Sequence, residues 1–185
     1  MSLVYLRVAL RGEDLAAISA LDVLRSELGA EDLAALTRET VWAIELPESQ
    51  SNARGADSDA TSAQATAALT RAARESLLFA NPVKERWRIE EGMLTLRGAP
   101  GRRAVGLLVR DRGDRAGEAR AAALRDTWNV AAANVTRATL WILDLPDHGR
   151  EAALERAREL GITTGRRSGL LVNPQYQDVD FVTGP

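Results

Sequence analysis

The chain has 185 residues, of which 45% are hydrophobic and 27% are charged, and its formal net charge at pH 7 is −2. This balance is typical of one medium globular domain or two small ones, and it does not indicate nucleic-acid binding. The sequence contains no cysteine, which excludes disulfides, thiolate metal sites and cysteine nucleophiles. No apolar run approaches the roughly 18 residues of a membrane helix, and the first residues lack a signal-peptide pattern, so we expect a cytoplasmic protein without membrane partners.

A single histidine, His148, further limits the chemistry of the chain. It stands in the sequence Pro-Asp-His-Gly, which is typical of a turn, so we interpret it as a solvated turn residue. A serine hydrolase would need His148 as its base, and this is the least favoured of three functional hypotheses. The sequence has no glycine-rich phosphate loop and no carboxylates at metal-ligand spacing. We therefore predict no catalytic, cofactor-binding or metal-binding residues.

The sequence repeats itself at an offset of about 99 residues. Four segments return in the same order: Val8–Arg11 as Leu107–Arg110, Leu24-Arg25 as Leu124-Arg125, Thr40–Pro47 as Thr139–Pro146, and Leu78–Pro82 as Leu171–Pro174. This order predicts a first module at residues 1–91, a linker at 92–101 and a second, diverged module at 102–185. Each module is long enough to form a core of its own.

Both modules begin with a strand and a helix. Apolar residues alternate in the strand, at Val4, Leu6 and Val8 in the first copy and at Val105, Leu107 and Val109 in the second. The helix that follows has one apolar face at steps of 4, 3 and 4, formed by Ala17, Leu21, Leu24 and Leu28, and by Gly117, Ala121, Leu124 and Trp128. Glu13-Asp14 suits the start of the first helix, and Gly29 suits its end.

The remaining elements follow the same plan. A second strand ends at Pro47 or Pro146, and a second helix covers roughly 62–80, whereas glycines divide its counterpart at about 150–172 into two short helices. An Asn-Pro pair ends each helix, and the last strand alternates from Val83 in the first module and through Val179 in the second. Residues 48–61 contain no large apolar residue and predict a mobile loop. Residues 93–97 suit a hairpin partner for the sheet.

Each module therefore reads β-α-β-α-β. This order predicts an α+β fold with antiparallel sheets and helices packed on one face. Because both modules keep the same apolar registers, we expect them to pack together as an internal pseudo-dimer. Further self-association stays open.

One segment of the first module resembles a known family. Residues 77–90 read Leu-Leu-Phe-Ala-Asn-Pro-Val-Lys-Glu-Arg-Trp-Arg-Ile-Glu. This segment resembles the C-terminal signature of PurS, in which a helix ends in Leu-Leu-Ala-Asn-Pro-Val and leads into a strand. Tyr5–Arg11, the helix after it and Glu39–Leu46 also follow the family's order. The resemblance covers residues 3–91 well and 103–182 more weakly.

The sequence departs from the family in three ways, one of which is a loop at residues 48–61 that is longer than expected. The family commonly starts its second strand with a Gly-Lys/Arg-Tyr pattern, whereas this chain has Arg38-Glu39-Thr40. The family unit is usually a single module that dimerises, whereas this chain carries two modules fused.

The resemblance implies an accessory role in purine biosynthesis. PurS is the small subunit of phosphoribosylformylglycinamidine (FGAM) synthase, a glutamine-dependent ligase complex. It bridges a large synthetase subunit and a glutaminase subunit, supports assembly and ammonia transfer, and has no catalytic residues. We therefore expect this chain to bind both subunits, to be inactive alone and to need no cofactor.

Six residues are candidates for interfaces between modules or with partners: Trp42, Trp141, Asn81, Pro82, Asn173 and Pro174. The tryptophans occupy equivalent strand positions, which are typical of core or module contacts. Asn81 and Asn173 suit helix caps or turns. The alternative and more specific hypothesis is that they contact a partner protein. The alternative function is a tandem ferredoxin-like or ACT-type module that senses a small molecule, which shares the duplicated, helix-backed sheet.

Overall fold

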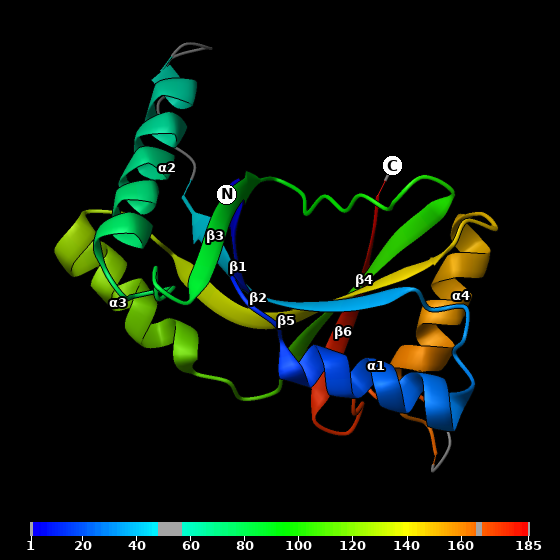
Figure 1. Cartoon of the computed structure of the whole chain (residues 1–185). Helices are drawn as coiled ribbons and strands as arrows, with labels where there is room; N and C mark the ends of the chain where they lie inside the picture. The colour runs from blue at the N-terminus through cyan, green and yellow to red at the C-terminus, as the bar shows by residue number, and fades with distance from the viewer. Residues whose placement is uncertain (1, 48–56, 166–167, 185) are drawn as a thin grey trace. The chain divides into compact units, whose positions relative to one another are not determined.

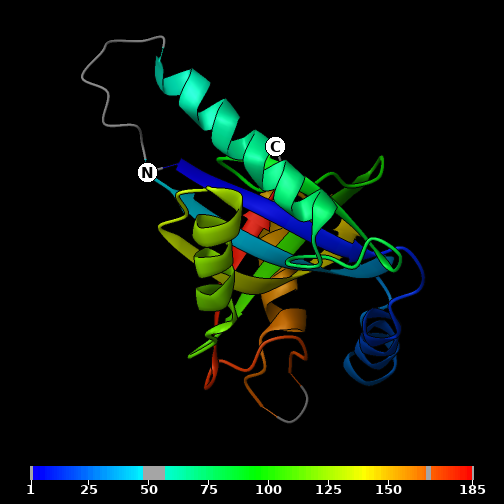
Figure 2. The same ribbon diagram turned by 90° about the vertical axis from the view of Figure 1, so that its left-hand side faces the viewer.

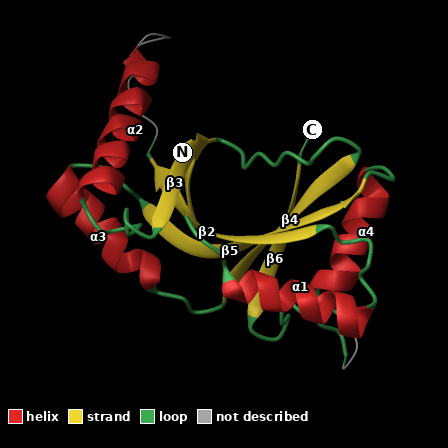
Figure 3. Cartoon of the chain, in the orientation of Figure 1, coloured by secondary structure: helices red, strands yellow, loops and turns green. Residues whose placement is uncertain are grey.

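The computed structural model describes residues 2–47, 57–165 and 168–184 of the chain. The helices and strands run in the order β1 (Ser2–Leu10), α1 (Leu15–Leu28), β2 (Ala35–Leu46), α2 (Asp57–Glu75), β3 (Glu85–Glu91), β4 (Arg102–Asp111), α3 (Ala116–Trp128), β5 (Asn134–Pro146), α4 (Arg150–Gly161) and β6 (Gln177–Thr183) (Figure 3). Among the described residues, no helix is both long enough and apolar enough to cross a membrane.

The strands form a six-stranded sheet in the order β3-β1-β2-β5-β4-β6. The pairings β1 with β3, β4 with β5, and β4 with β6 are all antiparallel. The expected mixed α+β fold with an antiparallel sheet is thus confirmed.

The chain folds into two compact units that do not follow the sequence modules. Unit 1 comprises Met1–Arg11, Val41–Leu94 and Asp114–Arg137, and unit 2 comprises Gly12–Thr40, Thr95–Gly113 and Ala138–Pro185. Unit 1 therefore joins β1, α2 and β3 with α3, whereas unit 2 joins β4, α4 and β6 with α1. Strands β2 and β5 contribute to both units. The modules 1–91 and 102–185 describe a sequence repeat, and that division stays a prediction.

The core of unit 1 lies on one face of its strands. Leu6 of β1 packs there with Leu69 of α2 and Leu124 of α3, all three fully buried. Figure 2 shows α2 lying along β1. Helix α3 approaches β5 closely, because a Cβ on Gly117 would lie 1.6 Å from the carbonyl oxygen of Val135. The predicted face of α3 is confirmed, and glycine is needed at its point of closest approach.

The core of unit 2 repeats this arrangement with α1 and α4 (Figure 1). Leu107 of β4, Leu24 of α1 and Leu160 of α4 are buried in it. The predicted limits of α1 are also confirmed. The Asp14 side chain accepts hydrogen bonds from two amides of the first turn, and Gly29 ends the helix with a left-handed φ of 63°.

The second helices differ from the sequence predictions. Helix α2 begins at Asp57, so residues 57–61 are helical and not part of a loop, while residues 48–56 lie outside the described residues. Alanine, the best helix former, recurs through α2 from Ala60 to Ala73, and a helix needs no large apolar side chain to form.

Helix α4 ends at Gly161, and the described residues after it contain isolated bridges in place of a second short helix. A Cβ on Gly161 would lie 2.1 Å from Leu107 Cδ2, and one on Gly169 would lie 2.0 Å from the Ile162 carbonyl oxygen. These glycines permit close packing, and they do not divide two helices.

Residues 93–97 form no strand, and they instead supply Leu96 to the sheet face opposite the helices of unit 2. The nearest atoms to a Cβ on Gly106 would be side-chain carbons of Leu96, Leu140 and Val182. The apolar residues of this segment therefore pack on the sheet face, and they do not pair with the sheet as a hairpin strand.

The ladders at the two sheet edges share one register. Val4 pairs with Glu91 in β1–β3, and Val105 pairs with Thr183 in β4–β6. Val8 therefore corresponds to Val109, which corrects the sequence match of these strands by two residues. The error has a simple cause, since an alternating strand matches itself after any shift of two positions.

The two halves of the chain also share a polar contact. Arg38 Nε donates to Asp14 Oδ2 at 2.9 Å in unit 2, and Arg137 Nε donates to Asp114 Oδ2 at 2.8 Å in unit 1. Each aspartate also accepts a backbone amide at the start of a helix. Each pair thus ties a helix start to a central strand.

Candidate functional site

Trp42 is a core residue of unit 1. Its side chain is 3% exposed, and its ring meets that of Phe79 edge-on at a centroid distance of 5.7 Å. The guanidinium of Arg120 lies 4.0 Å from the centre of the indole ring. The indole Nε1 is buried and has no hydrogen-bond partner among the described residues. Trp42 therefore stabilises the unit from within and offers no surface to a partner.

Trp141 occupies the corresponding strand position in unit 2 but is only partly buried. The guanidinium of Arg38 lies 5.6 Å from the centre of its ring. In both units an arginine thus covers the tryptophan, at a position where cation–π attraction contributes roughly 0.5–2 kcal/mol. The sequence equivalence of the two tryptophans did not indicate this difference in burial.

The first Asn-Pro pair, Asn81-Pro82, builds an exposed turn before β3. Asn81 Oδ1 accepts from the Val83 amide at 3.0 Å, and the Asn81 carbonyl accepts from the Glu85 amide at 2.7 Å. The Glu85 carboxylate accepts from the Asn81 amide at 2.7 Å. Arg11 Nε donates to the Pro82 carbonyl at 3.2 Å. The asparagine side chain holds the turn, as the sequence indicated.

The second pair, Asn173-Pro174, builds the same turn before β6. Asn173 Oδ1 accepts from the Gln175 amide at 3.1 Å, and the Asn173 carbonyl accepts from the Gln177 amide at 2.9 Å. Gln177 Oε1 accepts from the Asn173 amide at 2.8 Å. Arg112 Nη1 donates to the Gln175 carbonyl at 3.3 Å. The two turns, one in each unit, therefore present the same backbone shape.

Large exposed apolar side chains flank both turns. Leu77 and Val83 are 74% and 82% exposed beside the first turn, and Leu170 and Tyr176 are 40% and 67% exposed beside the second. Sequence analysis missed this set and assigned Val83 to the apolar face of the last strand. Strand β3 begins only at Glu85, because the Asn81 turn extends to that residue. No periodic signal marked them, because Val83 continues the alternation of β3 and Leu77 continues the helical spacing of Leu69 and Ala73, which predicts buried positions.

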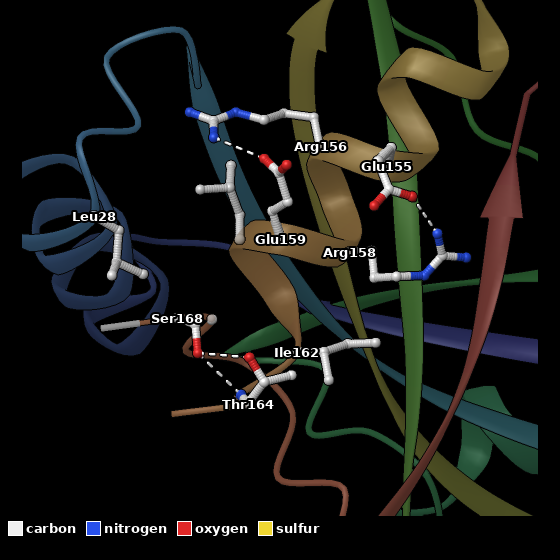
Figure 4. A pocket seen from close by; sticks show the side chains of 10 residues that line it. Leu28, Glu155, Arg156, Arg158, Glu159, Ile162, Thr164 and Ser168 are labelled. Atoms are coloured by element: carbon white, nitrogen blue, oxygen red, sulfur yellow. Dashed lines mark hydrogen bonds and ion pairs between the residues drawn. The ribbon is translucent and has the colours of Figure 1, made fainter. Parts of the chain in front are cut away.

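Unit 2 also contains an open cleft of about 420 Å³ between the end of α1 and α4. Leu28, Leu160 and Ile162 supply apolar surface. Every polar side chain that lines it is bonded to another, as Figure 4 shows for most of the pairs. These bonds join Arg156 to Asp32 and Glu159, Arg158 to Glu155, and Thr164 to Ser168. The polar side chains that line this cleft therefore already have hydrogen-bond or ion-pair partners within unit 2.

Unit 1 has a cleft of the same size at the corresponding place. It lies between α2 and the end of α3, has a volume of about 420 Å³, and is lined in part by Gln64, Arg71, Trp128 and Asn129. Trp128 takes the place that Leu28 has in the other cleft. No sequence motif marks either cleft, because each brings together helices that are distant in the sequence.

Charge pairing sets the protonation of the groups near these sites. The hydrogen bond from Arg156 lowers the pKa of Asp32 below its ordinary value, and the same contact raises the pKa of Arg156. Burial lowers the pKa of Arg120, whose guanidinium covers Trp42. None of these groups is arranged as an acid–base pair.

His148 and the arginine pair Arg102-Arg103 are not assembled into a reactive site. His148 is exposed, and its side chain makes no hydrogen bond within the described residues. Arg102 pairs with Asp144 at 3.2 Å and Arg103 with Asp147 at 2.9 Å. Arg166 and Arg167 lie outside the described residues. In the described part of the chain no three or more metal-ligating groups gather.

Comparisons with protein-family models, with curated protein sequences and with solved structures found no match for this chain. An assignment of function therefore depends on the residues and geometry described above.

Proposed function

We propose that the chain is a non-catalytic bridging subunit of FGAM synthase, which joins the synthetase and glutaminase subunits and supports ammonia transfer between them. The observation that carries this proposal is the pair of equivalent Asn-Pro turns with exposed apolar side chains. A bridge needs two docking surfaces, and each unit offers one of the same shape.

The composition of these surfaces suits protein contact. Exposed leucine, valine and tyrosine side chains beside a rigid turn bury apolar area on docking at a low entropic cost. The turns are pre-organised, since their polar groups are bonded within the turn. Asn81, Pro82, Asn173 and Pro174 act in this proposal as the scaffold of the surfaces, and the flanking side chains make the contacts.

The duplicated contacts support the further proposal that the chain is two fused modules arranged as an internal pseudo-dimer. The shared ladder register and the shared Arg–Asp pair are what a duplication would retain. Each module lends its first helix to the other unit, as exchanged elements do in swapped dimers. The fusion would fix two docking surfaces on one chain.

The test is reconstitution with the synthetase and glutaminase subunits of the source cell. Size-exclusion chromatography with light scattering measures assembly, and FGAM formation is followed with glutamine or with ammonium as the nitrogen source. The double variant Val83→Glu/Tyr176→Glu should weaken assembly about tenfold or more, because an anchor side chain is replaced by a charge at each surface. Glutamine-dependent synthesis should fall, while ammonium-dependent synthesis should remain, since free ammonium needs no transfer.

Leu15→Glu is the matched control, because Leu15 is 71% exposed on α1 and remote in sequence from both turns. It should leave assembly unchanged. The proposal is wrong if the wild-type chain elutes separately from both subunits, or if the double variant and the control behave alike.

A further inference from the structure

The two equivalent clefts differ in whether the polar side chains that line them have hydrogen-bond or ion-pair partners. In the unit 2 cleft, both arginines are neutralised by carboxylates of the same unit. In the unit 1 cleft, the side chains of Gln64, Arg71 and Asn129 have no hydrogen-bond or ion-pair partner within the described residues. The same place in the fold is thus saturated in one unit and open in the other.

The open cleft combines three kinds of recognition. Trp128 is partly buried against the unit 1 core and offers an aromatic surface. Arg71 supplies a permanent positive charge with a planar fork of donors, which matches phosphate geometry. Asn129 and Gln64 carry amides, which pair with the donor and acceptor edge of adenine. The volume of about 420 Å³ lies within the range of small-ligand sites.

The backbone at one edge of the cleft is rigid. Asn129 ends α3 in the left-handed region with φ 52°, and its amide donates to the Leu124 carbonyl. Its side-chain amide is therefore not needed to cap the helix. A fixed backbone with a free side chain is suited to contact with a ligand.

We propose that the cleft between α2 and the end of α3 binds an adenine nucleotide, with the base on Trp128 and the phosphate on Arg71. This site is independent of the two Asn-Pro turns. The cleft of unit 2 lacks the function, because Leu28 replaces the aromatic ring and its arginines are already paired.

Isothermal titration calorimetry of the full chain with adenosine 5′-monophosphate tests the proposal, with adenosine and inorganic phosphate as separate ligands. The monophosphate should bind more tightly than either part alone. Arg71→Gln should weaken its binding at least about tenfold, the usual effect of losing a charge-assisted hydrogen bond. The matched control is Arg74→Gln, which removes an exposed arginine from the same helix outside the cleft and should leave binding unchanged.

Trp128→Leu copies the residue of the other cleft and should weaken binding of both the monophosphate and adenosine. Thermal unfolding of this variant shows whether the fold is retained. Proton–nitrogen NMR spectra of the wild-type chain give a second measurement, because the Trp128 indole signal, identified by its loss in Trp128→Leu, should shift on titration. The proposal is overturned by absence of binding at millimolar nucleotide, by equal binding in Arg71→Gln and Arg74→Gln, or by an unmoved Trp128 signal.

Discussion

Replacing each of the two equivalent tryptophans by alanine should give unequal losses of stability. Trp42 is 3% exposed and contacts the Phe79 ring, whereas Trp141 is only partly buried. Removal of a fully buried tryptophan side chain costs about 3–5 kcal/mol. Loss of the Trp42 indole also removes a buried N–H that has no described partner. The desolvation penalty of this N–H, roughly 1–3 kcal/mol, then no longer destabilises the folded state and offsets part of the loss.

These two figures leave a loss of about 2 kcal/mol at their midpoints, and loss of the Arg120 contact with the indole ring adds roughly 1 kcal/mol, so the net loss for Trp42→Ala is about 3 kcal/mol. For Trp141→Ala we expect about half of the full-burial cost, or roughly 2 kcal/mol, because part of its area is already in water. Phenylalanine should retain more stability than alanine at both positions. The advantage of phenylalanine over alanine should be larger at position 42 than at position 141. Trp42→Phe retains an edge-on contact with Phe79 and removes the unpartnered N–H.

Urea unfolding followed by far-ultraviolet circular dichroism measures these differences as shifts of the midpoint at constant slope. Two separate transitions would be fitted separately, since the tryptophans belong to different units. A loss for Trp141→Ala equal to or greater than that for Trp42→Ala would refute the reasoning from burial.

Two further predictions concern packing and acid sensitivity. Gly117→Ala should destabilise the chain by about 1–3 kcal/mol in the same urea assay, because its Cβ would overlap the Val135 carbonyl, whereas Ala122→Gly would cost only about 1 kcal/mol of helix propensity. Asp32→Asn should lower stability at pH 7, since Arg156 lowers the folded-state pKa of Asp32 and the ion pair stabilises the chain above the unfolded-state pKa. The difference from wild type should shrink as the pH falls below about 4, and a difference that grows on acidification would contradict the assignment.

Several local features were determined by the sequence alone. The apolar face of α1, the acidic residues at its start and its terminal Gly29 were all predicted, and the structure confirms them. The turn-forming role of Asn81 and Asn173 was predicted as well. Each of these features depends on residues within a few positions of one another, so the sequence contains the whole interaction.

The first and last residues of the second helices were harder to predict from the sequence. Residues 57–61 have the polar composition typical of loops, yet they form the first turn of a helix whose later part is rich in alanine. The role of Gly161 as a contact point with Leu107 is invisible in the sequence, where a glycine near a helix end indicates only a break.

Tertiary structure decided which surfaces each helix meets. The apolar register shows that Leu24 and Leu124 are buried, but it does not show that Leu24 joins the core of β4 or that Leu124 joins the core of β1. The burial of Trp42, the two clefts and the exposed side chains beside the Asn-Pro turns also depend on which helix packs against which strands. Periodicity identifies a face that must leave water, whereas its partner depends on the path of the whole chain, because apolar burial has no preferred partner in sequence.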